Sequence, residues 1–366
     1  MNIIIMISSD VYEHYMIREI LEEPEALKRT IDLEYDRIRN VVNEIAAENY
    51  EMVYITGSGT SYHAGLASQY ALSNLAGLVS SALPASEFDR WVPKRISRRT
   101  LLIAISQSGE SSDVLEAADA ALKRKIPILA VTNTPGSSLS EKAEFHIFPR
   151  SGRENAIPAT KTYVTQLLSL FMFSIELAAK NVGDDELLDL RNRLYMAPQA
   201  VEHTLKSLIP KIKEASRRFK DLDVVFLLGS GANYATALEG ALKLKEACNI
   251  FSEGFATREF LHGPLRLVDE HTLVIMIAAP DEVESLVELS RSLKGFGAST
   301  ILVSESTRRT KLLTREVDEV FTVSSGMPLI FSPLLYILPL QVFTYYSSIF
   351  RGFNPDRPEK LKKVVK

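Results

Sequence analysis

Cysteine is nearly absent from this 366-residue sequence, which contains only Cys248. A single thiol excludes an internal disulfide framework and a metal site built from several cysteines. Such low thiol usage fits a reducing compartment, so we expect a cytoplasmic protein. Cys248 itself is most simply interpreted as a small core residue.

Excess positive charge is also missing. The formal net charge is −4, and the Lys and Arg residues form no basic cluster that would favour nucleic acid. No helix-turn-helix segment is evident, and no two of the six histidines have metal-ligand spacing. We therefore expect no nucleic-acid partner, no metal and no organic cofactor.

One strongly apolar segment, Met327–Phe350, has the length of a membrane span. It contains three prolines and Gln341. These residues favour a buried core helix or a dimer-interface helix over a membrane span. We therefore expect no contact with a membrane.

The order of apolar and helical patterns predicts two α/β domains. At about 150 residues per domain, the chain length favours two. Buried-strand patterns such as Leu101–Ile105 alternate with helical patterns such as Ser112–Lys123, which is typical of a doubly wound parallel sheet. The predicted divisions are a helical segment at 1–45, a first α/β domain at 46–182, a helical connection at 183–222, a second α/β domain at 223–350 and a C-terminal tail at 351–366.

An internal repeat relates the two α/β halves. The turn that begins at Gly57 aligns with the one that begins at Gly229, an offset of 229 − 57 = 172 residues. The same offset places Leu101–Ile105 on Leu273–Ile277, and an offset of one residue more pairs Ile128–Val131 with Ile301 and the residues after it. A nearly constant offset over three units indicates a duplication.

The segment 101–113 is the clearest candidate for a binding site. After its buried strand come four serines, Gln107 and Gly109, followed by a helical pattern. Such a turn exposes backbone N–H groups at a helix N-terminus, where the dipole favours an anion such as a phosphate monoester. A serine-rich helix cap is the simpler interpretation of this segment taken alone. The second half has Ala278–Asp281 at the equivalent turn, so the repeat predicts one phosphate site, in the first domain.

The second half contributes a charged helix. Glu239, Lys243 and Glu246 share one helix face, whereas the equivalent helix of the first half, Ser61 to Leu75, has no Asp, Glu, Lys or Arg. A solvated row of ion pairs is the usual explanation of this spacing. On a mostly buried helix, however, such charges need partners and have perturbed pKa values, and a carboxylate near a lysine suits proton transfer beside a sugar carbonyl.

Two further features of the second half are less specific. His262 precedes Gly-Pro and is expected in a turn, where it could exchange a proton during sugar-ring opening. The other five histidines, His63 among them, fall in no comparable setting. By composition alone the basic C-terminal segment would be a frayed, solvated tail.

Several motifs together resemble one family. They are Ser-Gln-Ser-Gly-Glu at 106–110, Asn-Thr-Pro-Gly-Ser-Ser-Leu at 133–139, Ala-Thr-Lys at 159–161, Leu-Glu-Gly-Ala-Leu-Lys-Leu-Lys-Glu at 238–246, His-Gly-Pro at 262–264 and Pro-Glu-Lys-Leu-Lys-Lys at 358–363. From about residue 50 to the end, the chain resembles tandem sugar isomerase (SIS) domains. This family includes the isomerase half of glucosamine-6-phosphate synthase and archaeal-type glucosamine-6-phosphate deaminases. The resemblance implies two flavodoxin-like, doubly wound parallel sheets.

The resemblance also implies roles for individual residues. Glu246 would move a proton between C1 and C2 with Lys243 beside it, Lys363 would form a Schiff base with the open sugar, and His262 would assist ring opening in the site of a neighbouring subunit of a homodimer. The residues implied to bind the phosphorylated sugar are Thr60, Ser61, Ser106, Gln107, Ser108, Ser111, Ile157, Ala159 and Lys362. Two departures, Leu261 in place of a lysine and Ala159 in place of a serine, concern the exact substrate.

The expected reaction is the conversion of glucosamine 6-phosphate and water to fructose 6-phosphate and ammonia. A synthase that uses glutamine has an amidotransferase domain with an N-terminal cysteine nucleophile. This sequence begins Met-Asn-Ile, and its first 50 residues are too few for such a domain, so free ammonia is expected. The alternatives are a fructosamine-6-phosphate deglycase, an isomerizing aminotransferase subunit fed by a separate glutaminase, and a non-catalytic sugar-phosphate sensor.

Overall fold

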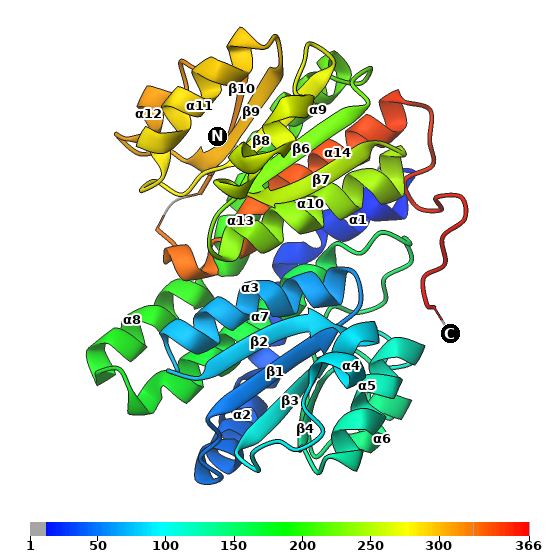
Figure 1. The fold of residues 1–366 in the computed structure, drawn as a ribbon, viewed down its shortest axis with the longest axis vertical. Coiled ribbons are helices and arrows are strands. Elements are labelled where there is room, and N and C mark those ends of the chain that lie inside the picture. The colour runs from blue at the N-terminus through cyan, green and yellow to red at the C-terminus, as the bar shows by residue number, and fades with distance from the viewer. Residues whose placement is uncertain (1–11, 325, 366) are drawn as a thin grey trace, which may run out of the picture.

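The structure is a computed structural model that describes residues 12–324 and 326–365. Residues 1–11, part of the helical segment expected at 1–45, lie outside the described residues. The rest of that segment forms α1 (Tyr15–Leu21) and α2 (Glu23–Ala47). Two parallel sheets follow along the chain, one in each half (Figure 1).

The first sheet has five parallel strands in the order β2-β1-β3-β4-β5. Its strands are β1 (Met52–Gly57), β2 (Val79–Pro84), β3 (Thr100–Ile105), β4 (Ile128–Val131) and β5 (Phe145–Ile147). Its helices are α3 (Thr60–Asn74), α4 (Phe88–Trp91), α5 (Ser112–Lys123), α6 (Ser138–Lys142) and α7 (Lys161–Leu177), with a 3-10 turn at Ala85–Glu87 and another at Ala178–Lys180. All six residues of β3 are buried, as expected for a central parallel strand covered on both faces.

The second sheet repeats this order as β7-β6-β8-β9-β10. Its strands are β6 (Val224–Gly229), β7 (Phe251–Ala256), β8 (Thr272–Ile277), β9 (Ser299–Glu305) and β10 (Glu319–Val323). Its helices are α10 (Ala232–Cys248), α11 (Val283–Gly295), α12 (Thr310–Leu313), α13 (Pro333–Tyr336) and α14 (Leu338–Phe350), with 3-10 turns at Glu259–His262, Pro264–Leu267 and Leu329–Phe331. Two flavodoxin-like parallel sheets are therefore present, which confirms the predicted fold class.

Strand register confirms the duplication and corrects one of its details. Met52 pairs with Thr100 in the first sheet, and Val224 pairs with Thr272 in the second, so the offset is 172 on both strands. Ile128 pairs with Leu102, and its counterpart beside Val274 is Thr300. The extra residue predicted at this strand is therefore wrong. A one-residue slip would turn each side chain to the opposite face of the sheet.

Three strands, β2, β7 and β10, were not expected from the sequence, and all three lie at sheet edges. β2 and β7 are the edge strands beside β1 and β6. Their sequences, VSSALP and FSEGFA, mix polar and apolar residues without a continuous apolar run. An edge strand is buried on fewer sides than a central one, so the sequence pattern carries a weaker signal.

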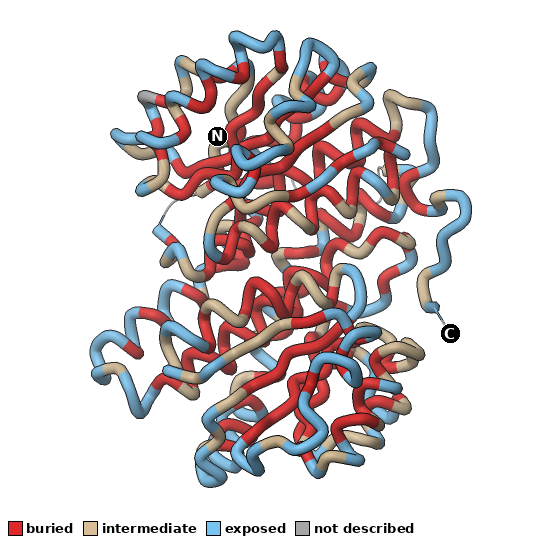
Figure 2. The backbone as a smooth tube through the Cα atoms, viewed as in Figure 1, coloured by how far each residue is buried: buried red, intermediate tan, exposed pale blue. Residues whose placement is uncertain are grey.

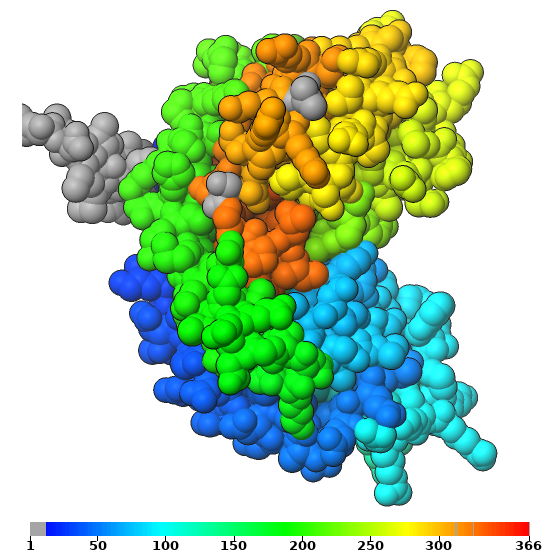
Figure 3. All heavy atoms as spheres, turned by 90° about the vertical axis from the view of Figure 1, so that its left-hand side faces the viewer, coloured from blue at the N-terminus to red at the C-terminus, as the bar shows by residue number. Residues whose placement is uncertain are grey.

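The helices between the two halves tie them together. α8 (Asp184–Tyr195) and α9 (Ala197–Arg218) form the connection. α9 packs against α2 on one side and α14 on the other, and α3 packs against α10. The green connecting helices run along both halves in Figure 3, and the buried positions continue from one half into the other in Figure 2.

Two helical segments, Lys161–Lys180 and Leu329–Phe350, are long and apolar enough to cross a membrane by length and composition. In each, 89% of the apolar window is buried within the protein. Both are therefore core helices, as predicted for the segment at 327–350. Because that segment is covered by the chain's own residues, it does not supply an apolar dimer face.

The C-terminal tail is docked rather than frayed. It runs from the second half back along the first (Figure 1). The Asp356 carboxylate accepts hydrogen bonds from the backbone N–H groups of Tyr15 (2.9 Å) and Met16 (2.8 Å) at the start of α1. The backbone carbonyl oxygen of Asp356 accepts from the N–H of Ile157 at 2.9 Å. Further along the tail, the carbonyl oxygen of Val365 accepts from the N–H of Ser112 at 3.3 Å.

Replacing Asp356 with Ala should detach the tail from α1. Two backbone N–H groups would lose their acceptor, so we expect the free energy of unfolding to fall by about 1–2 kcal/mol. Urea unfolding followed by circular dichroism measures this change. Asp356→Asn, which keeps one acceptor oxygen, should lose less, and equal stability of all three proteins would contradict the docking role.

Candidate active site

A cavity of about 290 Å³ opens at the carboxyl ends of β1 and β3. The strand order of the first sheet reverses direction between these two strands, which is where ligands bind in open α/β sheets. The cavity is lined by Ser58, Gly59, Thr60, Ser61, Ser106, Gln107, Ser108, Ser111, Asp113, Glu154, Ile157, Ala159, Glu246, Leu361, Lys362, Lys363, Val364 and Val365. Eleven of the predicted site residues are in this set.

The turn after β3 has the geometry expected of an anion-binding loop. Ser106 Oγ accepts from the N–H of Gly109 at 3.1 Å. Gly109 has φ +69°, and a Cβ there would lie 2.0 Å from Ser137 Oγ, so glycine is required. The Glu110 carboxylate accepts from the N–H and the hydroxyl of Ser138, both at 2.8 Å. The loop is therefore anchored to α6 while the first turn of α5 faces the cavity.

The start of α3 lines the opposite side of the cavity. Gly59, the N-cap residue, has φ +54°, which lets β1 turn sharply into the helix. Ser61 Oγ accepts from Gln166 Nε2 at 3.1 Å. Thr60 donates its hydroxyl hydrogen to Glu239 Oε1 at 2.9 Å, so this turn also reaches α10 in the second domain.

A buried chain of charges runs along α10. Lys243 is fully buried, and its Nζ lies 2.6 Å from Glu246 Oε2 and 3.3 Å from Glu239 Oε1. It also donates to Thr60 Oγ1 at 3.1 Å. Glu246, with 19% of its side chain exposed, lines the cavity, whereas Lys243 and Glu239 lie behind it. The prediction of a buried charged helix is correct, and Lys243 positions Glu246 from behind.

The pKa values in this chain follow from burial and pairing. Burial opposes the charge of Lys243, but Glu239 and Glu246 outweigh it and raise its pKa above the ordinary value. Burial also opposes ionisation of Glu239, yet Lys243 and His63 hold its pKa below the usual range. Lys243 and Glu239 therefore both remain charged at neutral pH.

His63 belongs to this network, although the sequence analysis gave it no role. Its Nδ1 lies 2.7 Å from Glu239 Oε2, and since a carboxylate only accepts, Nδ1 carries the hydrogen. His63 lies one helical turn after Thr60 on α3, so both residues reach α10 from the first domain. The spacing of Thr60 and His63 after the glycine turn is the sequence signal that could have identified it.

Lys363 enters the cavity from the docked tail. Its Nζ lies 2.6 Å from Glu154 Oε2, 2.7 Å from the carbonyl oxygen of Ala156 and 3.4 Å from that of Ile157. Glu154 is wholly buried. Burial opposes its ionisation, but Lys363 and the N–H groups of Thr160 and Thr162 keep its pKa below the ordinary value. Glu154 and Asp113 are cavity residues that the sequence analysis missed.

Of the two predicted site residues that do not line the cavity, Lys243 lies directly behind Glu246, whereas His262 has no contact with this network. It ends the 3-10 turn Glu259–His262, is exposed and does not line the cavity. The expectation that His262 acts in a neighbouring subunit stays a prediction. Ile157, Ala159 and Lys362 line the cavity beside Lys363.

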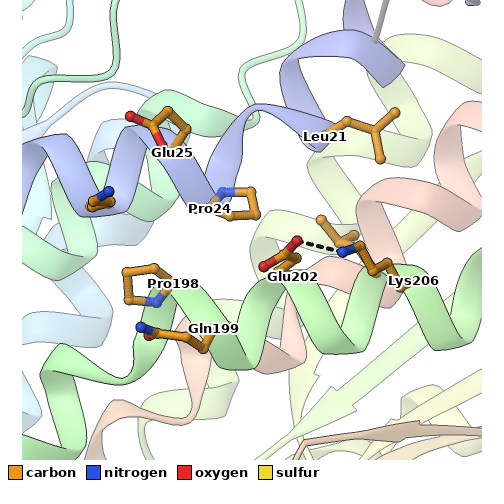
Figure 4. A pocket seen from close by; sticks show the side chains of 9 residues that line it. Leu21, Pro24, Glu25, Pro198, Gln199, Glu202 and Lys206 are labelled. Carbon is orange, nitrogen blue, oxygen red and sulfur yellow. Dashed lines mark hydrogen bonds and ion pairs between the residues drawn. The ribbon is translucent and has the colours of Figure 1, made fainter. Parts of the chain in front are cut away.

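A second hollow of about 400 Å³ lies between α2 and α9 (Figure 4). Its side chains include Glu25, Pro198 and a surface ion pair between Glu202 and Lys206. None of the predicted site residues lies there. The smaller cavity, where the serine turn meets Glu246 and Lys363, is therefore the candidate active site.

Comparison with known proteins identifies the family. The sequence model of the SIS domain matches residues 48–175 and 219–351. The chain therefore belongs to the SIS domain family. Each matched segment contains one of the two parallel sheets.

Curated relatives share most of the chain. The proteins described as glutamine–fructose-6-phosphate aminotransferase (isomerizing) from Methanothermobacter thermautotrophicus and Thermococcus kodakarensis are 39% and 38% identical to it over 97% of its length. The chain spans 58% of the length of each relative.

Solved structures agree over nearly the whole chain. The C-terminal domain of glucosamine-fructose-6-phosphate aminotransferase from Francisella tularensis is 29% identical with a TM-score of 0.86, covering 96% of this chain and all of that one. Glucosamine-6-phosphate deaminase from Thermotoga maritima is 25% identical with a TM-score of 0.75, covering 96% of this chain and 99% of that one.

Replacing Lys243 with Met should destabilise the protein strongly. The substitution leaves the carboxylates of Glu239 and Glu246 without their shared cation, and breaking a buried ion pair costs about 3–5 kcal/mol. The surface pair of Lys206 and Glu202 on α9 provides the control, because Lys206→Met should change stability by less than about 0.5 kcal/mol. Similar losses in both variants, measured by urea unfolding, would contradict the buried network.

Glu19 should make stability depend on pH. Burial and the nearby Glu154 raise its pKa from 4.5 to about 7, while its carboxylate accepts from the N–H of Ala156 at 3.2 Å. Between pH 4.5 and about 7, Glu19 keeps its proton in the folded protein but has lost it in the unfolded chain. The free energy of unfolding therefore falls as pH rises through this window, by about 2–3 kcal/mol in total.

Glu19→Gln keeps an acceptor oxygen but removes the titration, so it should flatten this slope. Urea unfolding at pH 5 and pH 8 measures the difference. Glu25→Gln, on the exposed side of α2, should keep the slope of the parent protein. A slope that survives Glu19→Gln unchanged would show that other groups cause it.

Proposed function

We propose that this protein interconverts glucosamine 6-phosphate and fructose 6-phosphate, releasing ammonia from the amino sugar in the presence of water. The observation that carries the proposal is the meeting of three segments at one cavity. The serine turn comes from the first domain, Glu246 from the second and Lys363 from the tail. Binding a sugar phosphate would not require a carboxylate and a lysine amine beside it, so an enzyme is favoured over a sensor.

The phosphate site follows from the serine turn. Hydroxyl groups of Ser106, Ser108 and Ser111 and the N-terminus of α5 would bind the phosphate, with Gln107 adding an amide. Thr60 and Ser61 lie across the cavity and would contact the sugar. The remaining binding residues, Ile157, Ala159 and Lys362, would form the wall next to Lys363.

The chemistry is divided between a carboxylate and an amine. In the open form of glucosamine 6-phosphate, Glu246 would take the proton from C2 and return it to C1, which converts the aldehyde and amine to a C2 ketimine. Lys363 as a free amine would attack C2 and displace ammonia, leaving a lysine iminium. Water then releases fructose 6-phosphate and restores Lys363. Lys243 holds the carboxylate of Glu246 in place.

The related proteins support the substrate class. One matched structure is described as a glucosamine-6-phosphate deaminase and the aligned relatives as glutamine–fructose-6-phosphate aminotransferases. The first name describes removal of an amino group from a sugar phosphate, and the second describes transfer of one to a sugar phosphate. Aminotransfer with a nitrogen donor is therefore the second candidate for this chain. Deamination tests the sugar chemistry by itself because that direction needs no donor.

His262 would complete the site from a partner subunit of a homodimer. It is exposed within one chain, whereas a group that opens the sugar ring must reach the cavity. If sites are shared in this way, mixing inactive His262→Ala and inactive Lys363→Ala chains should restore part of the activity. Mixtures that remain inactive would contradict the shared site.

The first assay follows ammonia and fructose 6-phosphate together in a reaction started with glucosamine 6-phosphate. We expect equal amounts of both products, and Lys363→Ala should reduce turnover by at least about 10³-fold because the covalent step is lost. Lys360→Ala changes a lysine of the same tail outside the cavity and should retain normal turnover.

A binding measurement distinguishes loss of the reaction from loss of sugar-phosphate binding. Lys363→Ala should still bind fructose 6-phosphate, measured by calorimetry. Binding without ammonia release in the unmodified chain would favour the sensor. Release of glucose 6-phosphate from a fructosamine 6-phosphate, without action on glucosamine 6-phosphate, would favour the deglycase.

A further inference from the structure

The two oxygens of the Glu154 carboxylate have different hydrogen-bond partners. Glu154 lies in the loop between β5 and α7. Its Oε1 accepts from the N–H groups of Thr160 at 2.9 Å and Thr162 at 3.1 Å. Its Oε2 lies 2.6 Å from Nζ of Lys363. One oxygen is therefore fixed by the start of α7, and the other is aimed at the lysine from the wall of the cavity.

We propose that Glu154 is the counter-ion of Lys363 in both of its cationic states, first the ammonium and then the iminium that Lys363 forms at C2 of the sugar. The inference rests on the proposed function, because it assigns a second group to the covalent step. Glu154 contacts the reacting nitrogen, which makes it a catalytic residue. No comparable role follows for Glu246, whose carboxylate is paired with Lys243.

The covalent step balances in atoms and charge with this arrangement. In the direction that starts from fructose 6-phosphate, the Lys363 ammonium gives one proton to Glu154, and the neutral amine adds to the C2 carbonyl carbon. The resulting hydroxyl takes the proton back from Glu154 and leaves as water as the C–N double bond forms. A cation on nitrogen is present before and after the step, so one carboxylate at 2.6 Å can stabilise both states.

Among the ionisable groups around Lys363, Glu154 is the one placed to act as its counter-ion. The ionisable groups that interact with Glu154 from α1, α2 and the tail are Glu19, Glu23 and Lys363. Lys161 of α7 interacts with Glu19 and Glu23. Burial raises the pKa of Glu23 well above its ordinary value and that of Glu19 to about 7. Both shifts favour the uncharged form of these neighbours, and Glu154 is the carboxylate in contact with Lys363. The carbonyls of Ala156 and Ile157 orient the amine but cannot neutralise a cation.

The variant Glu154→Gln tests the inference, since its amide oxygen can still accept from the start of α7 but carries no charge. Without a counter-ion, the ammonium and the iminium should both lose a proton more readily. We therefore expect the pH–rate profile for ammonia release to move to lower pH by about one unit or more, with kcat about 10–100-fold lower. A role limited to holding the loop would lower kcat without moving the profile.

The pair of Glu22 and Lys161 provides a matched control. Its contact is also 2.6 Å, between Glu22 Oε2 and Lys161 Nζ, and it lies outside the cavity. Glu22→Gln makes the same chemical change, and we expect its kcat and pH–rate profile to match those of the unmodified chain. An equal shift in both variants would overturn the inference.

Reductive trapping separates this inference from the proposed function. Borohydride added with fructose 6-phosphate should reduce the iminium, and the mass of the peptide identifies Lys363 as the site. If the unmodified chain neither releases ammonia nor becomes labelled at Lys363, the proposed function fails. If it does both, and the profile of Glu154→Gln stays in place or moves to higher pH, the counter-ion role alone is wrong.

A second variant covers the case in which Glu154→Gln does not fold. Glu154→Asp keeps the charge but withdraws it by one methylene group. A weaker counter-ion should move the pH–rate profile in the same direction by a smaller amount. A profile that coincides with that of the unmodified chain would then overturn the inference.

Discussion

The ammonium group of Lys243 is enclosed by protein and lies within 3.3 Å of two carboxylates, those of Glu239 and Glu246. A charge in this position is tolerable only if its partners remain in place. Thr60 and His63 hold the same network from α3, so the charges of the second domain are satisfied by the first. Both the packing of the domains and the direction of Glu246 depend on this one buried cation.

The duplication explains how two similar domains form one site. The first copy uses its serine turn to anchor a ligand, and at the equivalent turn of the second copy the Glu282 carboxylate accepts from the N–H of Ala279 at 3.1 Å. In the second copy, the carboxylate of Glu282 thus takes up a backbone N–H group of this turn. In the first copy, the equivalent turn presents serine hydroxyl groups to the cavity. The second copy supplies the charged helix α10 instead, and the tail returns to the first domain to add Lys363.

Much of the site could be predicted because its residues lie in local motifs. The serine turn follows a continuous buried strand, and the charges of α10 stand out against the uncharged α3, so periodicity and comparison of the two copies were sufficient. Lys363 was found only through family resemblance, because a basic C-terminal sequence gives no sign of docking. Glu154 and His63 were missed, since each acquires its role from a partner far away in the sequence, Lys363 and Glu239.

The sequence by itself determined the two α/β domains, the repeat and the serine turn, because buried strands, helix spacing and glycine turns are encoded by neighbouring residues. Only the tertiary structure decided the register of β9, the edge strands β2, β7 and β10, and the contacts of Lys363 with Glu154 and of His63 with Glu239. These features depend on hydrogen bonds and ion pairs between distant segments. Their energies arise only after the chain has brought the two halves and the tail together.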